Sequence, residues 1–168
     1  MSKKLTILFI PMNALGHLNP LIGFGQNLVP KHRVVFAVSK KSKGQLTKYG
    51  FEETDLNIED TFFNMDKDKM KEFTEEKKFF EERTPMEGWK HLVEEDFFMK
   101  LAQVSDSAAK EVVERVKPDL LVMDCTFILP SAIKAHQGPW INLVLPNPNT
   151  VLFEERSSPP GLGNKHFI

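Results

Sequence analysis

Cysteine is almost absent from this sequence. Cys125 is the one cysteine among 168 residues, which excludes an internal disulfide framework and fits a reducing compartment. An excess of charge of either sign is also lacking, because the net charge is -1 at pH 7. That balance gives no electrostatic basis for binding nucleic acid or an anionic membrane surface. We therefore expect a cytoplasmic protein that binds neither nucleic acid nor a membrane.

Membrane-spanning and leader features are lacking near the N-terminus as well. The apolar run there extends only from Leu5 to Met12 and is followed by the polar Asn13. It is too short for a transmembrane helix, and no small-residue cleavage site follows it. The run is more typical of a strand that begins the fold.

The common motifs for cofactor binding are missing too. No G-x-G-x-x-G follows the first apolar run, and G-x-x-x-x-G-K-[ST] does not occur, which argues against NAD and ATP sites of the usual kinds. We expect Cys125 to be an ordinary buried residue. We expect no metal and no resident cofactor, because the histidines show no metal-ligand spacing; they are His17, His32, His91, His136 and His166.

What the sequence does contain is a regular alternation of apolar runs and helical patterns. The runs that predict buried strands are 5–10, 34–38, 119–123 and 140–145, with a weaker one at 51–56. The helices predicted between them are 19–30, 42–49, 84–116 and 130–136. Alternation of this kind indicates an α/β, Rossmann-like fold with a mostly parallel sheet and helices on both faces. We expect residues 1–168 to form one domain.

Local signals predict where the first helix begins and how it packs. Asn19 is the expected N-cap and Pro20 the first helical residue, and Pro30 ends the helix. Gly23 and Gly25 each cost about 1 kcal/mol relative to alanine inside a helix. Such glycines are tolerated where a helix packs very closely on a sheet.

A second helix start is predicted at Thr84, where Pro85 takes the first position and Glu87 completes a capping box. The helix is expected to restart at Ser105-Asp106, because an unbroken run to Val116 would be unusually long. An apolar stripe at helical spacing should form its core-facing side; it consists of Met86, Trp89, Val93, Phe97, Leu101, Val104 and Ala108.

Residues 57–83 allow two interpretations. Charged residues dominate the second half of this segment, and phenylalanines are scattered among them. One interpretation is a surface helix with a modest apolar face. The other is a mobile lid whose aromatic side chains line an apolar ligand cleft.

Two residues that can perform acid–base chemistry lie just past strand ends. His17 follows the first predicted strand, and Asp124 ends the fourth. In open parallel sheets, ligands bind beyond the carboxyl ends of the strands where strand order reverses. A neutral imidazole there can accept a proton from a substrate hydroxyl, and a carboxylate on its other nitrogen would hold its tautomer. A structural histidine and an aspartate that caps or turns the chain are the alternatives.

Two stretches resemble the UDP-glycosyltransferases of glycosyltransferase family 1. One is Lys117 to Asp124, which resembles that family's later strand and its aspartate. The other is Phe9 to Ser39, which resembles the family's opening, with matches at Pro11, Gly16-His17, Pro20, Leu28, His32, Val34, Phe36 and Ser39. The resemblance implies a GT-B architecture, in which this chain is the N-terminal, acceptor-binding half. It implies that His17 is the general base and Asp124 its partner.

The same resemblance implies a donor and an acceptor. The donor would be a UDP-sugar, and the acceptor a small lipophilic compound with a hydroxyl group. The donor-binding signature of the family is missing, so we expect a domain that is incomplete at its C-terminus, lacks the donor-binding domain and is inactive or nearly so alone. The loops at the strand ends should bind the acceptor; their candidate residues are Met12, Asn13, Thr126, Phe127 and Asn147.

Two other functions stay open at this stage. The chain could be a binding module that holds a lipophilic ligand without catalysis. It could also be the acceptor subunit of a split glycosyltransferase whose donor domain is a separate chain. Four aromatic residues, Phe62, Phe63, Trp89 and Phe97, are expected in the core rather than against a ligand.

Overall fold

The described part of the chain folds around a parallel sheet of five strands in the order β3-β2-β1-β4-β5. The computed structural model describes residues 3–12, 15–58, 84, 87, 90, 97–124 and 129–143. The strands are β1 (Thr6–Ile10), β2 (Arg33–Val38), β3 (Glu52–Asp55), β4 (Leu120–Asp124) and β5 (Trp140–Leu143). The helices are α1 (Leu15–Gln26), α4 (Phe97–Val116) and α5 (Pro130–His136). The predicted α/β, Rossmann-like fold is thereby confirmed.

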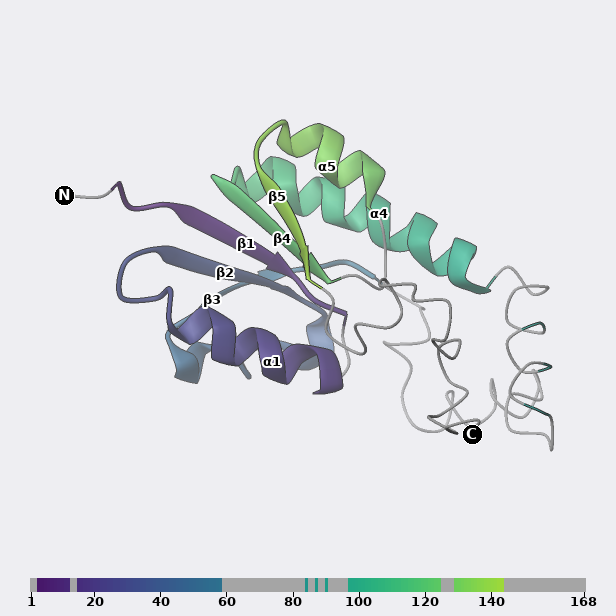
Figure 1. The fold of residues 1–168 in the computed structure, drawn as a ribbon, viewed down its shortest axis with the longest axis horizontal. Helices are drawn as coiled ribbons and strands as arrows, with labels where there is room; N and C mark the ends of the chain where they lie inside the picture. The colour runs from purple at the N-terminus through teal and green to yellow at the C-terminus, as the bar shows by residue number, and fades with distance from the viewer. Residues whose placement is uncertain are drawn as a thin grey trace, which may run out of the picture.

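Helices cover both faces of the sheet, as Figure 1 shows, with α1 on one side and α4 and α5 on the other. This arrangement explains why β1, β2 and β4 are continuous apolar runs, because alternate residues of each strand face different helices. The prediction of a buried strand is wrong for β5, an edge strand whose Trp140 and Ile141 are 47% and 42% exposed. The core on the α4 and α5 side includes Leu8, Ile10, Val35, Ala37, Ala109, Val112, Leu121, Met123, Leu129 and Ala132. The core on the α1 side includes Ile7, Phe9, Leu18, Leu21, Val34, Phe36, Val38, Leu46, Phe51 and Val122.

Helix α1 begins earlier than the sequence signals indicate. The predicted N-cap, Asn19, and first helical residue, Pro20, lie inside the helix, which already includes Leu15. Pro20 lacks an N–H and so removes one hydrogen bond of the helical ladder. Leu18, at 6% exposure, buries its side chain in the α1 core beside Leu21. Burial of such a side chain stabilises the fold by about 1.5–3 kcal/mol, enough to offset the bond lost at Pro20.

The two glycines of α1 differ in how closely they are packed. A Cβ at Gly25 would lie 3.1 Å from the Phe51 ring and 3.3 Å from Phe36, whereas one at Gly23 would meet nothing within 4 Å. Close packing is therefore confirmed at Gly25 and is wrong as an explanation of Gly23.

The predicted helix over residues 42–49 is replaced by two short 3-10 turns, Lys40–Ser42 and Thr47–Tyr49. Gly44 has a φ of 83° between them, a left-handed conformation that interrupts any helix. The Glu53 carboxylate of β3 accepts hydrogen bonds from the backbone N–H groups of Leu46 at 2.6 Å and Thr47 at 3.1 Å. A side chain of the next strand thus satisfies backbone donors that a continuous helix would have paired.

Helix α4 runs unbroken through Ser105 and Asp106, so the predicted restart is wrong. Ser105 is buried, and the expected core residue Val104 is 44% exposed, whereas Ala108 is buried as predicted. The capping box is present: the Thr84 N–H donates to Glu87 Oε2 at 2.8 Å, and the Glu87 N–H donates to Thr84 Oγ1 at 3.4 Å. Met86, Trp89, Val93 and residues 59–83 lie outside the described residues, as do the side chains of Phe97 and Leu101.

Within the described ranges, no helix combines the length and the apolar character needed to cross a bilayer. Among these helices α4 is the longest, with 20 residues, but charged residues recur along it.

The amino ends of β1 and β4 are fastened by Asp119. Its carboxylate accepts hydrogen bonds from the Thr6 N–H at 2.8 Å and from Lys3 Nζ at 3.0 Å. These two bonds, the backbone one first, hold the pKa of the Asp119 carboxyl below its ordinary value. A group with a lowered pKa in the folded state stabilises the fold above its unfolded pKa, and this contribution is lost as the pH falls through the folded pKa.

We therefore predict that Asp119→Asn flattens the loss of stability in acid. The free energy of unfolding of the wild type should fall more steeply below about pH 4 than that of the variant. Urea unfolding at a series of pH values measures the two slopes. Equal slopes would show that Asp119 does not contribute through its ionised form.

Candidate active site

The strand order creates a switch point between β1 and β4. The chain leaves β1 through α1 toward β2, whereas β4 continues through α5 toward β5 on the other side. β1 and β4 are paired in parallel with Ile10 opposite Met123, so Pro11 and Asp124 follow side by side at the carboxyl edge. In open α/β sheets this edge, at the point where strand order reverses, is where ligands bind.

His17 lies in the first turn of α1 and reaches back toward that edge. Side chains of a helix tilt toward its N-terminus, so an early residue of α1 is directed at the ends of β1 and β4. His17 Nδ1 lies 2.6 Å from Asp124 Oδ2. The helix that places the imidazole is anchored by the burial of the next residue, Leu18. The contact joins residues that are 107 positions apart in the sequence.

Asp124 is a buried carboxylate, with 2% of its side chain exposed. Burial of an ionised carboxylate is costly unless the group is paired and hydrogen-bonded. Besides His17, the Met12 N–H faces Asp124 Oδ2 at 3.4 Å. An ionised carboxylate only accepts hydrogen bonds, so pairing with an ionised Asp124 requires Nδ1 of His17 to carry the proton.

This tautomer leaves Nε2 of the neutral ring with a free lone pair. The His17 side chain is 17% exposed, whereas that of Asp124 is almost fully buried. A neutral imidazole in this state can accept a proton from a hydroxyl group. The paired carboxylate then stabilises the imidazolium that forms. The arrangement is thus chemically competent as a base.

Of the five residues predicted to contact an acceptor, one lies within the described ranges. Met12 is partly buried and contributes its backbone N–H to Asp124, a contact for which the sequence carries no signal because any residue except proline supplies that donor. The others lie outside the described residues, and their roles stay predictions; they are Asn13, Thr126, Phe127 and Asn147. Cys125 also lies outside them.

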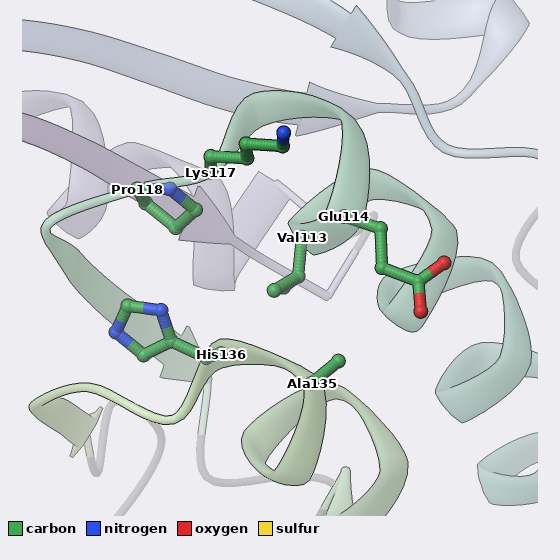
Figure 2. Close-up of a pocket in the computed structure, with 6 residues that line it drawn as sticks. All are labelled: Val113, Glu114, Lys117, Pro118, Ala135 and His136. Atoms are coloured by element: carbon green, nitrogen blue, oxygen red, sulfur yellow. The ribbon is translucent and has the colours of Figure 1, made fainter.

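A hollow of about 390 Å³ lies between the C-terminal ends of α4 and α5 (Figure 2) and is separate from this site. Lys117 and Pro118, which line it, precede β4, whereas Asp124 ends that strand. A strand advances about 3.3 Å per residue, so the length of β4 separates the two places. His136 lines the same hollow and is fixed there by its Nε2, which donates to the Pro139 carbonyl oxygen at 2.9 Å.

The part of the chain that the structure describes contains no cluster of potential metal ligands. No three histidine, cysteine, aspartate or glutamate side chains there could hold an ion together. The expectation of a site without metal or cofactor stays a prediction.

In its fold, this chain is similar to solved glycosyltransferases. The glycosyltransferase of kitacinnamycin superposes with a TM-score of 0.57 at 17% identity, over 84% of this chain and 30% of that one. CalG4, the calicheamicin glycosyltransferase, gives 0.54 at 16% identity, over 94% of this chain and 34% of that one. SsfS6 from Streptomyces sp. SF2575, complexed with thymidine diphosphate, gives 0.52 at 18% identity, over 82% and 38%.

These likenesses establish the class of fold. The chain has the Rossmann-like α/β fold found in part of these glycosyltransferases, and it spans only about a third of their length. No protein-family model and no curated protein matches this chain in sequence. That residues 1–168 are one incomplete, acceptor-binding domain stays a prediction.

The pairing of His17 with Asp124 predicts a measurable coupling in stability. His17→Ala should lower the free energy of unfolding by about 1–3 kcal/mol, because it leaves the buried Asp124 carboxylate without its side-chain partner. In the double variant His17→Ala/Asp124→Ala the two losses should not add, with a coupling energy of about 1 kcal/mol or more. Urea unfolding of the four proteins measures this cycle.

His32 provides the matched control. It precedes β2 at the amino edge, where its Nδ1 accepts the Leu5 N–H at 3.3 Å, far from Asp124. His32→Ala combined with Asp124→Ala should therefore be additive. Additivity of the His17 and Asp124 substitutions would contradict the pairing.

Proposed function

We propose that this chain is the N-terminal, acceptor-binding part of a sugar-nucleotide-dependent glycosyltransferase. The observation that carries the proposal is the 2.6 Å contact between His17 and the buried Asp124 at the switch point of the sheet. The fold shared with solved glycosyltransferases supports it, since such a pair lies where this type of sheet binds ligands. Fold alone hosts many activities, so the site is what selects this one.

In the proposed reaction, the acceptor is a small lipophilic molecule with a hydroxyl group. His17 Nε2 takes the hydroxyl proton as the acceptor oxygen attacks the anomeric carbon of the sugar. The new bond forms between that carbon and the acceptor oxygen, and the bond to the diphosphate oxygen breaks. The nucleoside diphosphate leaves with the bonding electron pair, and a single displacement inverts the anomeric centre. Asp124 stabilises the imidazolium that His17 becomes.

The donor is proposed to be a UDP-sugar, in keeping with the family that the sequence resembles. SsfS6 was solved with thymidine diphosphate, so TDP-sugars form the natural comparison set. We propose that the donor is bound by a further domain, in the same chain or in a separate one. The chain of residues 1–168 by itself should show little or no transfer.

The direct test is substitution of His17 in a form that includes a donor-binding domain. His17→Ala should lower kcat for transfer to the phenol 7-hydroxycoumarin by about 10²–10⁴-fold, because the general base is lost. His136→Ala, which alters a histidine at the opposite edge of the sheet, should leave kcat within about twofold of the wild type. Fluorescence of the free phenol measures turnover with UDP-glucose and with TDP-glucose in parallel.

Wild-type turnover in His17→Ala would overturn the proposed role of His17. Faster transfer from TDP-glucose than from UDP-glucose would show that the donor is a TDP-sugar and not the proposed UDP-sugar. Tight binding of 7-hydroxycoumarin without any response to either donor would instead support a non-catalytic binding module.

A further inference from the structure

The edge strand next to the candidate active site exposes apolar side chains. β5 consists of Trp140, Ile141, Asn142 and Leu143 and so carries no charged residue. Ile141 is 42% exposed, and Leu143 is partly buried. Single exposed apolar residues are common on protein surfaces, whereas apolar residues that adjoin one another mark places where ligands or partners bind. The position of these two residues relative to the site therefore decides what they mean.

The pairing of β4 with β5 places Leu143 directly beside Asp124. The two residues are opposite each other in the register of these strands, and neighbouring strands lie about 4.8 Å apart. Asp124 points to the face of the sheet that α1 covers, because it contacts His17 there. Leu143 packs against the core of the same face. An apolar side chain thus lies next to the catalytic candidate on the face that carries His17.

Ile141 continues this apolar surface toward the amino edge. Side chains two positions apart on a strand point to the same face, so Ile141 follows Leu143 at about 6.6 Å along β5. It ends a row that runs across four strands through Phe36, Phe9 and Val122. The other three residues of the row are at most 1% exposed, whereas Ile141 is 42% exposed. The cover over this face therefore ends before β5.

Helix α1 adds a third apolar side chain on the same side. Phe24 lies two helical turns after His17, so the two side chains leave α1 in nearly the same direction. The Phe24 ring meets the Phe9 ring edge-on, with 6.1 Å between the centroids, and Phe24 is 48% exposed. We call Phe24, Ile141 and Leu143 the apolar strip.

The apolar strip and the His17–Asp124 pair have complementary chemical properties. Sites for small molecules are lined mostly by apolar side chains, with a few polar groups that fix the orientation of the ligand. The pair supplies the polar groups for one hydroxyl, and the strip supplies apolar surface that begins next to Asp124. A ligand that combines a hydroxyl with an apolar ring system matches both. A ligand that is polar throughout would gain nothing from the strip.

We propose that the apolar strip binds the ring system of the acceptor while the acceptor hydroxyl lies at His17. Ile141 and Leu143 are then specificity-determining residues, because they contact the part of the acceptor that does not react. They favour lipophilic hydroxyl compounds over small polar ones. The inference rests on the proposed function for the identity of the ligand, but binding alone tests it.

The first test titrates the chain of residues 1–168 with 7-hydroxycoumarin and follows the fluorescence of the ligand. Ile141→Ala and Leu143→Ala should each raise Kd about three- to tenfold, because apolar contact with the ring system is lost. Ile141→Val keeps most of that contact and should stay within about twofold of the wild type. Trp140→Ala is the matched control. It removes an exposed apolar side chain from the opposite face of the same strand and should leave Kd unchanged.

A second ligand separates specificity from a general defect. Phenol carries the hydroxyl but has a single ring, so less of it reaches the strip. Its Kd, measured by competition with 7-hydroxycoumarin, should change less than twofold in Ile141→Ala. A structural defect would weaken both ligands alike. In a form with a donor-binding domain, Ile141→Ala should raise the KM for 7-hydroxycoumarin about three- to tenfold and leave kcat within about twofold.

Equal Kd values for 7-hydroxycoumarin in the wild type and in both alanine variants would overturn the inference. Absence of binding to the wild type would also overturn it. Protection of the Ile141 and Leu143 amides from hydrogen exchange in a longer form, with no binding of the ligand, would show that another part of the protein covers the strip. Strip-dependent binding without sugar transfer from either donor would support the strip as a ligand site and contradict the proposed function.

Discussion

The contact between His17 and Asp124 depends on the order of the strands and on where α1 begins. It also gives this edge of the sheet a side chain that can act as a base. A buried carboxylate is costly unless it is hydrogen-bonded, and the His17 imidazole lies within hydrogen-bonding distance of Asp124, at 2.6 Å. The contact requires β1 and β4 to be neighbours, and it requires α1 to begin early enough to bring His17 over the strand ends. The hydrogen bond between His17 and Asp124 therefore depends on both the order of the strands and the packing of Leu18.

Most of the architecture follows from simple patterns in the sequence. The central strands β1, β2 and β4 are apolar runs because a parallel sheet covered on both faces buries nearly all of their residues, whereas the edge strands β3 and β5 are partly exposed. Two of the wrong predictions concern places where tertiary packing outweighed local signals. Asn19-Pro20 has the pattern of a helix start, but α1 already begins at Leu15, and Leu18 before this pattern is buried in the core. Ser105-Asp106 also has that pattern, but α4 continues, and Asp106 instead caps a different helix.

Part of the candidate site could be predicted from the order of strands along the chain. Residues that directly follow adjacent parallel strands converge at one edge of the sheet, so Asp124 could be placed from the sequence alone. His17 was expected in a loop before the helix and lies in its first turn instead, which still directs it toward the same edge. The contribution of Met12 could not be foreseen, because it comes from the backbone and any residue except proline could supply it.

The same physical setting explains why the pair can act as a base. A carboxylate on Nδ1 dictates which nitrogen of the neutral ring carries the proton, and the remaining nitrogen keeps a lone pair that can accept one. The solved glycosyltransferases with this fold extend to about three times the length of the chain. In the proposed function, this domain would hold one hydroxyl compound and accept its proton.

The tautomer of His17 is the most direct test of this account. Long-range ¹H–¹⁵N correlation spectra of the imidazole distinguish a protonated from an unprotonated ring nitrogen. The account predicts that the neutral His17 ring carries its proton on Nδ1 and has an unprotonated Nε2, and that Asp124→Asn changes this distribution. A neutral ring with the proton on Nε2 in the wild type would contradict it, since the nitrogen that must accept the hydroxyl proton would already be occupied.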